Sequence, residues 1–121
     1  MSDSILKYEE RMWELFKVSQ AEMPDLNEAY SRHVKEVAFG EGVLAQKTKR
    51  LIALAVAVQA GCRDGMVSQT SKALDAGATV PEIFEACQVA IGMGGSLAWS
   101  KSLIVAEYLL ERGLISSDNE D

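Results

Sequence analysis

Residues 47–62, KTKRLIALAVAVQAGC, decide the fold of this chain. Within them, residues 51–58 are apolar without interruption. A helix that is apolar on every side has to be covered on every side, so this one belongs at the centre of a packed domain. We expect it to run over residues 47–60 and to end or bend at Gly61.

Amphipathic spacing predicts further helices on both sides of the central one. Pro24 suits the first turn of a helix, where its missing N–H costs nothing. Thr79 and Glu82 have the spacing of a capping box, and the Met-Gly-Gly sequence of residues 93–95 predicts a break. No strand-like alternation appears. The sequence therefore predicts an all-α domain of six helices, over residues 4–23, 24–39, 47–60, 63–76, 80–92 and 96–112.

Chain length and surplus apolar surface set the expected organisation. The 121 residues suffice for one domain, over residues 1–115, and the polar, acidic residues 116–121 are expected to form a disordered tail. Residues 96–112 carry two apolar stripes, more than one neighbouring helix needs. Because exposed apolar patches of that size usually mark an interface, we expect a homo-oligomer.

The charge balance and the cysteine content argue against several classes of function. With 12 basic and 18 acidic residues the net charge is −6, which disfavours nucleic acid and anionic membrane surfaces as partners. The chain opens without a basic-then-apolar signal peptide, and its longest apolar run is too short to span a bilayer. Two cysteines do not make a disulfide framework. We therefore expect a cytoplasmic protein without a nucleic-acid or membrane partner.

Neither a metal nor an organic cofactor is expected. His33 is the only histidine, and no cysteines or carboxylates cluster at ligand spacing, which argues against a metal centre. Residues 93–95 lack the preceding strand and the lysine of a phosphate-binding loop. His33 remains a candidate general base, although nothing in the sequence places it near Cys62.

The central stretch and residues 71–98, SKALDAGATVPEIFEACQVAIGMGGSLA, together resemble the alkylhydroperoxidase D-like family, which includes the carboxymuconolactone decarboxylases. The resemblance covers about the central half of the chain. It lies in the combination of an apolar helix, Gly-Cys, an amphipathic helix, DAGAT-x-x-E and MGG. It implies an all-helical subunit that assembles into trimers, hexamers or similar oligomers. In redox-active members it also implies a Cys-x-x-Cys pair at a helix start, a histidine four residues after the second cysteine, and a glutamate twelve residues before the first.

Three of these four redox positions differ in this sequence. Cys62 is present, but Gly65 occupies the position of the second cysteine, Gln69 that of the histidine and Arg50 that of the glutamate. Without a second thiol no intramolecular disulfide can form. Gln69 cannot accept a proton at neutral pH, and Arg50 can only donate hydrogen bonds. We interpret these changes as loss of the dithiol peroxidase cycle.

Our first hypothesis is a non-redox family member that binds or acts on a small organic acid, with carboxymuconolactone decarboxylase-like lyase chemistry as the version that the resemblance suggests. If the chain folds back at Gly61, Arg50 faces Gln69 across the hairpin. Arg50 would then hold a carboxylate by a two-pronged hydrogen bond, with Lys47 and Lys49 as further substrate-binding cations. Gln69, together with Cys62, is a candidate catalytic residue. Alternatively, the three cations form an ordinary solvated turn.

Two other hypotheses remain open. The protein could be a catalytically silent oligomeric module, with its function in assembly or partner binding. It could also retain a single-thiol, peroxidase-type antioxidant activity through Cys62 and an external thiol. Cys62 is either a thiol activated by the helix start and Arg63 or a small residue at a tight helix junction. Cys87 lies on an apolar stripe and is expected to be a buried structural thiol.

Overall fold

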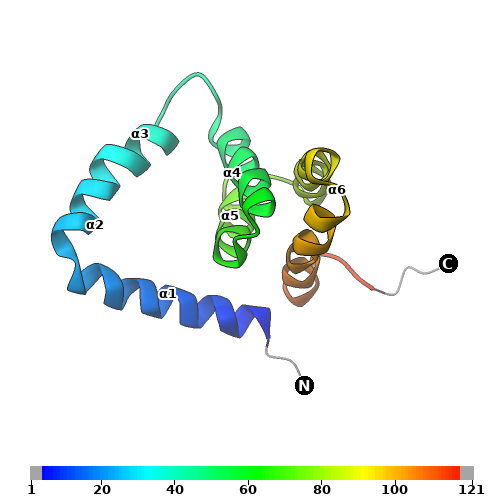
Figure 1. The fold of residues 1–121 in the computed structure, drawn as a ribbon, viewed down its shortest axis with the longest axis horizontal. Helices are drawn as coiled ribbons and strands as arrows, with labels where there is room; N and C mark the ends of the chain where they lie inside the picture. The colour runs from blue at the N-terminus through cyan, green and yellow to red at the C-terminus, as the bar shows by residue number, and fades with distance from the viewer. Residues whose placement is uncertain (1–3, 118–121) are drawn as a thin grey trace.

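The structure is a computed structural model that describes residues 4–117. Every regular element in this part of the chain is a helix, which confirms the all-α prediction (Figure 1). Residues 118–121, most of the predicted tail, lie outside the described residues. In chain order the elements are α1 (Ile5–Glu22), α2 (Pro24–Tyr30), the π-helical turn η1 (Ser31–Lys35), α3 (Glu36–Phe39), α4 (Gln46–Ala60), α5 (Arg63–Asp75) and α6 (Val80–Glu111).

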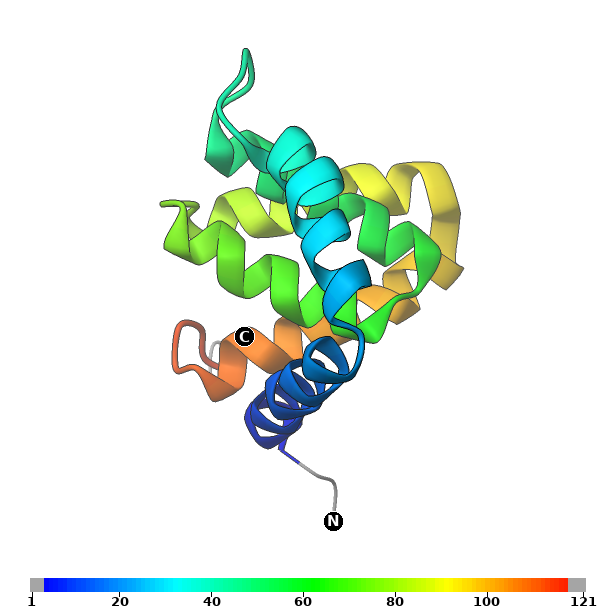
Figure 2. The same ribbon diagram turned by 90° about the vertical axis from the view of Figure 1, so that its left-hand side faces the viewer.

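The helices match the predicted segments, except that the last two are joined. α2, η1 and α3 follow one another without leaving helical backbone and form one rod, as predicted for residues 24–39. The predicted helices over 80–92 and 96–112 are the two halves of α6. The break expected at residues 93–95 is a kink at Gly95, with φ 72° and ψ −157° (Figure 2). With α2 to α3 counted as one rod, residues 4–117 contain five helices.

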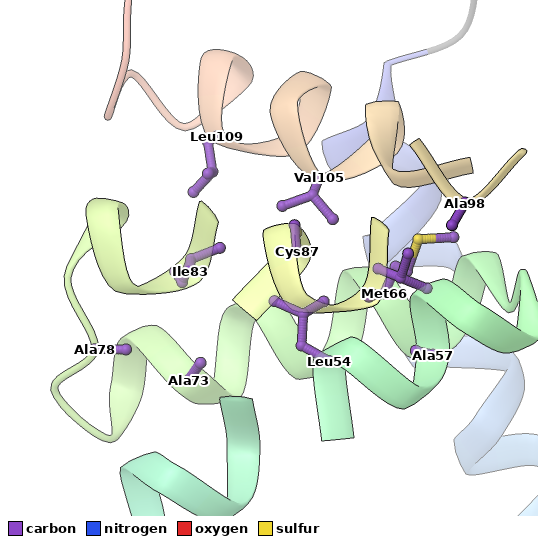
Figure 3. Close-up of a cluster of buried hydrophobic side chains, with 12 residues drawn as sticks. Leu54, Ala57, Met66, Ala73, Ala78, Ile83, Cys87, Ala98, Val105 and Leu109 are labelled. Carbon is purple, nitrogen blue, oxygen red and sulfur yellow. The ribbon is translucent and has the colours of Figure 1, made fainter. Parts of the chain in front are cut away.

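The core forms where α4, α5 and α6 pack against one another. Ile83 and Cys87 in the first half of α6 lie between the α4–α5 pair and the second half of α6 (Figure 3). From that second half Val105 and Leu109 point inward, and from α4 Leu54 does so on the opposite side. The most apolar segments of the chain are therefore gathered around one central half-helix.

Within a single chain, α4 is covered on one side only. Leu54 and Val58 are fully buried, whereas Ile52 is 48% exposed and Val56 is 61% exposed. The prediction that this helix is covered on every side is therefore wrong for the isolated chain. Its second apolar side lines a cavity and is otherwise open.

Helices α1 to α3 form an arm that curves around one side of the α4–α5 hairpin (Figure 1). The start of the arm is anchored to α6, because Glu111 accepts hydrogen bonds from the Ser4 hydroxyl (2.7 Å) and the Leu6 N–H (3.1 Å). These bonds lower the pKa of Glu111 to about 2. Tyr108 donates a hydrogen bond to Glu9 at 3.0 Å. Farther along, α2, η1 and α3 bury no residue, and the far end of the arm meets α4 through Phe39, whose ring lies 3.8 Å from the Arg50 guanidinium carbon.

By length and composition, one described helix, α6, could cross a membrane. That is weak support for a membrane segment, because the core helix of a folded domain passes the same test. α6 is kinked at Gly95, and its buried residues pack on α4 and α5.

Candidate functional site

The α4–α5 hairpin brings two of the predicted site residues together. α4 ends at Gly61, whose φ of 68° and ψ of 29° place it in the left-handed region that favours glycine. Cys62 caps the start of α5 directly afterwards. The two helices then run back along each other, and Arg50 Nη1 donates a hydrogen bond to Gln69 Oε1 at 3.2 Å. The predicted meeting of Arg50 and Gln69 is thus observed.

Arg50 is half-buried and held in one orientation. Its guanidinium carbon lies 3.8 Å from the centroid of the Phe39 ring at the end of the arm. Burial lowers the pKa of Arg50 below its ordinary value. Among the ion pairs formed by residues 4–117, none involves Arg50. The guanidinium therefore has an aromatic ring on one face and an amide at one edge, and it forms no ion pair with a carboxylate of the described residues.

Two lysines join Arg50 around a recess of about 500 Å³. Lys35 comes from η1 and Lys72 from α5, and the acidic residue Glu36 also lines the recess. The pKa of Lys72 is lowered first by burial and then by repulsion from Lys35 and Arg50. Within the described part of the chain, neither lysine makes an ion pair. We call Lys35, Arg50 and Lys72 the cation cluster.

The other two predicted binding cations each have a partner of their own. Lys47 Nζ forms an ion pair with Glu82 Oε2 at 2.9 Å, at the start of α6. Lys49 Nζ donates to the carbonyl of Gly40 at 2.7 Å, in the loop before α4. Lys47 is therefore held away from the cation cluster, whereas the ammonium group of Lys49 contacts Gly40, which lines the same recess.

Cys62 lies at the junction of two cavities. One, of about 490 Å³, lies between the arm and α5. The other, of about 550 Å³, lies between α3, α4 and α5 and is lined mainly by apolar side chains. Cys62, Gly65 and Gln69 line both. The two cavities are thus neighbours that share one face of α5.

The two thiols have different surroundings. Cys62 is exposed, and its sulfur accepts a hydrogen bond from the Gly65 N–H at 3.2 Å. Cys87 is 3% exposed, and burial raises the pKa of its thiol to about 11. The prediction of a buried structural thiol at Cys87 is confirmed. These are the only cysteines of the chain, so Cys62 has no partner for a disulfide within the site.

A tyrosine that sequence reasoning did not single out joins the arm to the start of α5. The Tyr8 hydroxyl donates a hydrogen bond to Asp64, and the guanidinium of Arg63 lies 4.2 Å from the centroid of the Tyr8 ring. The pKa of Tyr8 is raised, chiefly by the hydrogen bond to Asp64 and then by burial. Asp64 lines the cavity between the arm and α5, as Cys62 does, so one end of that cavity carries a negative charge.

His33 stays apart from these groups. It lies on η1, is exposed and lines neither of the two cavities that contain Cys62. Among residues 4–117, no three side chains of the His, Cys, Asp and Glu types come close enough together to hold a metal ion.

Comparisons with known proteins point to one family. Residues 24–108 match the family model of the carboxymuconolactone decarboxylases. The fold is similar to a crystal structure of the apo form of a carboxymuconolactone decarboxylase family protein from Legionella pneumophila, with a TM-score of 0.78 and 27% identity over 84% of this chain and 90% of that chain. A protein of Cupriavidus necator, described as uncharacterized, is 42% identical over 62 residues. That match covers 51% of this chain and about half, 55%, of the relative.

Proposed function

The chain belongs to the carboxymuconolactone decarboxylase family, and from this premise we propose that it is a non-redox member that binds or acts on a small organic acid between α4 and α5. What supports this is the meeting of Arg50 and Gln69, beside two lysines, at the place where redox-active relatives are expected to have an acid and an imidazole. The cluster is positive in a chain whose net charge is −6. Cations held close together in this way attract an anionic ligand.

Arg50 supplies the main contact to the acid. Phe39 stacks on its face and leaves N–H groups at the edge of the guanidinium for a two-pronged hydrogen bond to a carboxylate. Gln69 accepts from Arg50 through its oxygen, so its NH₂ group is available to orient a carbonyl or a water molecule. Lys35 and Lys72 add positive charge around this contact, whereas Lys47, which pairs with Glu82, does not.

The proposed reaction, if the acid is a substrate, is a decarboxylation by analogy with the family name. Breaking the bond between a carboxylate and the carbon next to a ketone releases CO₂ and leaves the electron pair on that carbon, where the ketone delocalises it as an enolate. The cation cluster would stabilise that negative charge. A water molecule held by the Gln69 NH₂ group would return a proton to carbon, and the hydroxide left behind would take up a proton from bulk solvent.

The test is a binding titration with a panel of organic acids, from monocarboxylates to tricarboxylates, by isothermal calorimetry. We expect Arg50→Ala to weaken binding about 10- to 100-fold, since a hydrogen bond to a charged group contributes about 1.5–3 kcal/mol. Arg32→Ala is the matched control, because Arg32 is an exposed arginine that pairs with Glu28 on the same rod. Unchanged affinities in Arg50→Ala would contradict the proposal.

A silent oligomeric module remains the second candidate. It is favoured by the apolar surface left open in a single chain, which includes Met93 (81% exposed), Leu97 (64%) and Trp99 (61%) around the kink in α6. Patches of this kind are buried when a protein assembles. The two candidates are compatible, because a homo-oligomer, with the trimer or hexamer that the family resemblance implies, can also carry the acid site.

A further inference from the structure

One face of α5 connects a thiol to the cation cluster. Cys62, Gly65, Gln69 and Lys72 follow one another at helical spacing, and all four line the arm cavity of about 490 Å³. Lys72 lies ten positions after Cys62, which corresponds to about 15 Å along the helix axis. The arm cavity is therefore an elongated groove with Cys62 at one end and Lys72 at the other.

The wall of this groove opposite α5 combines large apolar and aromatic side chains with smaller uncharged polar ones. It comes from the arm, and Lys72 Nζ lies 5.4 Å from the centroid of the Trp13 ring. Between its two ends the groove has no charged lining residue. The polar side chains there are Ser19, Gln20, Asn27, Ser31 and Ser68. Its large apolar and aromatic lining residues are Trp13, Phe16, Met23, Leu26 and Tyr30.

The two ends of the groove differ in charge. Lys35 and Lys72 line one end, and both also line the recess that contains Arg50. Asp64 lines the other end, directly after Cys62 in the chain. An anion is attracted to the first end and repelled from the second. The lysine end thus suits the anionic group of a ligand, and the Asp64 end suits an uncharged part of the same ligand.

Building on the proposed function, we propose that the organic acid is a monocarboxylate with an apolar chain or ring system of about 8 to 10 carbons, with its carboxylate at the cation cluster and its apolar end near Cys62. A second carboxylate on the ligand would lie against the uncharged side chains of the arm or face Asp64. Burying a charge without a partner is costly, so short dicarboxylates and tricarboxylates fit this groove poorly.

The experiment compares chain lengths and charges in one titration series. Butyrate, octanoate, decanoate, succinate, tricarballylate and the uncharged 1-octanol are titrated into the full chain below their aggregation concentrations. We expect the affinity to rise from butyrate to octanoate by at least tenfold, since each buried methylene contributes about fourfold. Octanoate should also bind at least tenfold more tightly than 1-octanol. Lys72→Ala should remove most of that difference, whereas Lys17→Ala, on the exposed side of α1, should leave it intact.

A second readout places the apolar end of the ligand. Cys62 is exposed and Cys87 is buried, so iodoacetamide should alkylate Cys62 first in the folded protein. Decanoate should slow this alkylation severalfold, and butyrate should not, because only the longer chain reaches the end of the groove. Alkylation at an unchanged rate with decanoate bound would overturn the proposed orientation.

The outcomes separate this inference from the proposed function. If succinate or tricarballylate binds more tightly than octanoate, and Arg50→Ala abolishes that binding, an acid site exists and the apolar-chain inference is wrong. If 1-octanol binds as tightly as octanoate, the cation cluster does not hold the carboxylate and the inference is again wrong. If no carboxylate of either kind binds, the proposed function fails together with it.

Discussion

Gly65 and Cys62 define, at the scale of single residues, what separates this site from a dithiol site. A Cβ atom built on Gly65 would lie 3.1 Å from the sulfur of Cys62. In a disulfide, the Cβ of one cysteine is about 3 Å from the sulfur of the other, given an S–S bond of about 2.05 Å. The backbone at this helix start therefore retains a geometry that one substitution could convert into a disulfide.

We predict that Gly65→Cys forms an intramolecular disulfide with Cys62 on treatment with diamide, which accepts the two hydrogens. Mass spectrometry should show a loss of about 2 Da that dithiothreitol reverses, because the sulfur atoms can reach S–S bonding distance. The contact of the new Cβ with Ala57, at 3.1 Å, requires only a small shift of that methyl group.

Ser68→Cys is the control for this disulfide. It adds a thiol to the same groove, nearly two turns beyond Cys62, where no intramolecular bond can close without moving the helix. Gly65→Cys should still reduce peroxide slowly, because Gln69 cannot act as the base that a rapid cycle needs. Two thiols that stay reduced in Gly65→Cys would show that the helix start is placed differently.

At the scale of the helix, substitution by alanine is expected to have opposite effects on stability at two glycines of α6. Gly95 has φ 72° and ψ −157°, a combination that only glycine readily adopts. Gly92 lies three residues earlier without a left-handed φ, and a Cβ atom there meets nothing within 4 Å. The same substitution therefore acts through backbone conformation at one position and through helix propensity at the other.

We expect Gly95→Ala to lower the free energy of unfolding by about 1–3 kcal/mol, and Gly92→Ala to raise it by about 0.5–1 kcal/mol. Each variant is the matched control of the other, because neither new methyl group meets a neighbour within 4 Å. Urea unfolding followed by circular dichroism measures both. Equal effects of the two substitutions would mean that α6 is not kinked at Gly95.

At the scale of the whole molecule, the exposed apolar side chains demand a partner surface. They are found on the outer side of α4, as at Val56 (61% exposed), and near the kink of α6, as at Leu97 (64%). A single chain of this size would leave an extensive apolar surface in water. We therefore expect copies of the chain to assemble and to cover α4 on its second side.

Light scattering after size exclusion should give a mass at least twice the 13.2 kDa of one chain. Leu97→Glu should shift this mass toward that of the single chain, because it places a charge in apolar surface that assembly would bury. Far-UV circular dichroism shows whether the variant remains helical. A wild-type protein that elutes as a single chain at all concentrations would contradict the prediction.

Sequence alone was sufficient for the features that depend on local spacing. The ends of the helices follow from Gly61, Pro24 and the Thr79 capping box, and the meeting of Arg50 with Gln69 follows from a hairpin of fixed pitch around Gly61. The absence of a second thiol three residues after Cys62 can be read directly from the sequence, which has Gly65 there. Each of these depends on residues within about twenty positions of one another, over which helix geometry is nearly constant.

The tertiary structure alone decided which charges share the site. Lys35 joins Arg50 and Lys72 only because the arm curves over the hairpin, and Lys47 turns to Glu82, 35 residues away along the chain. No periodicity predicts these meetings. They depend on the angles at which packed helices cross and on where the arm is anchored, which long-range side-chain packing sets and local propensity does not.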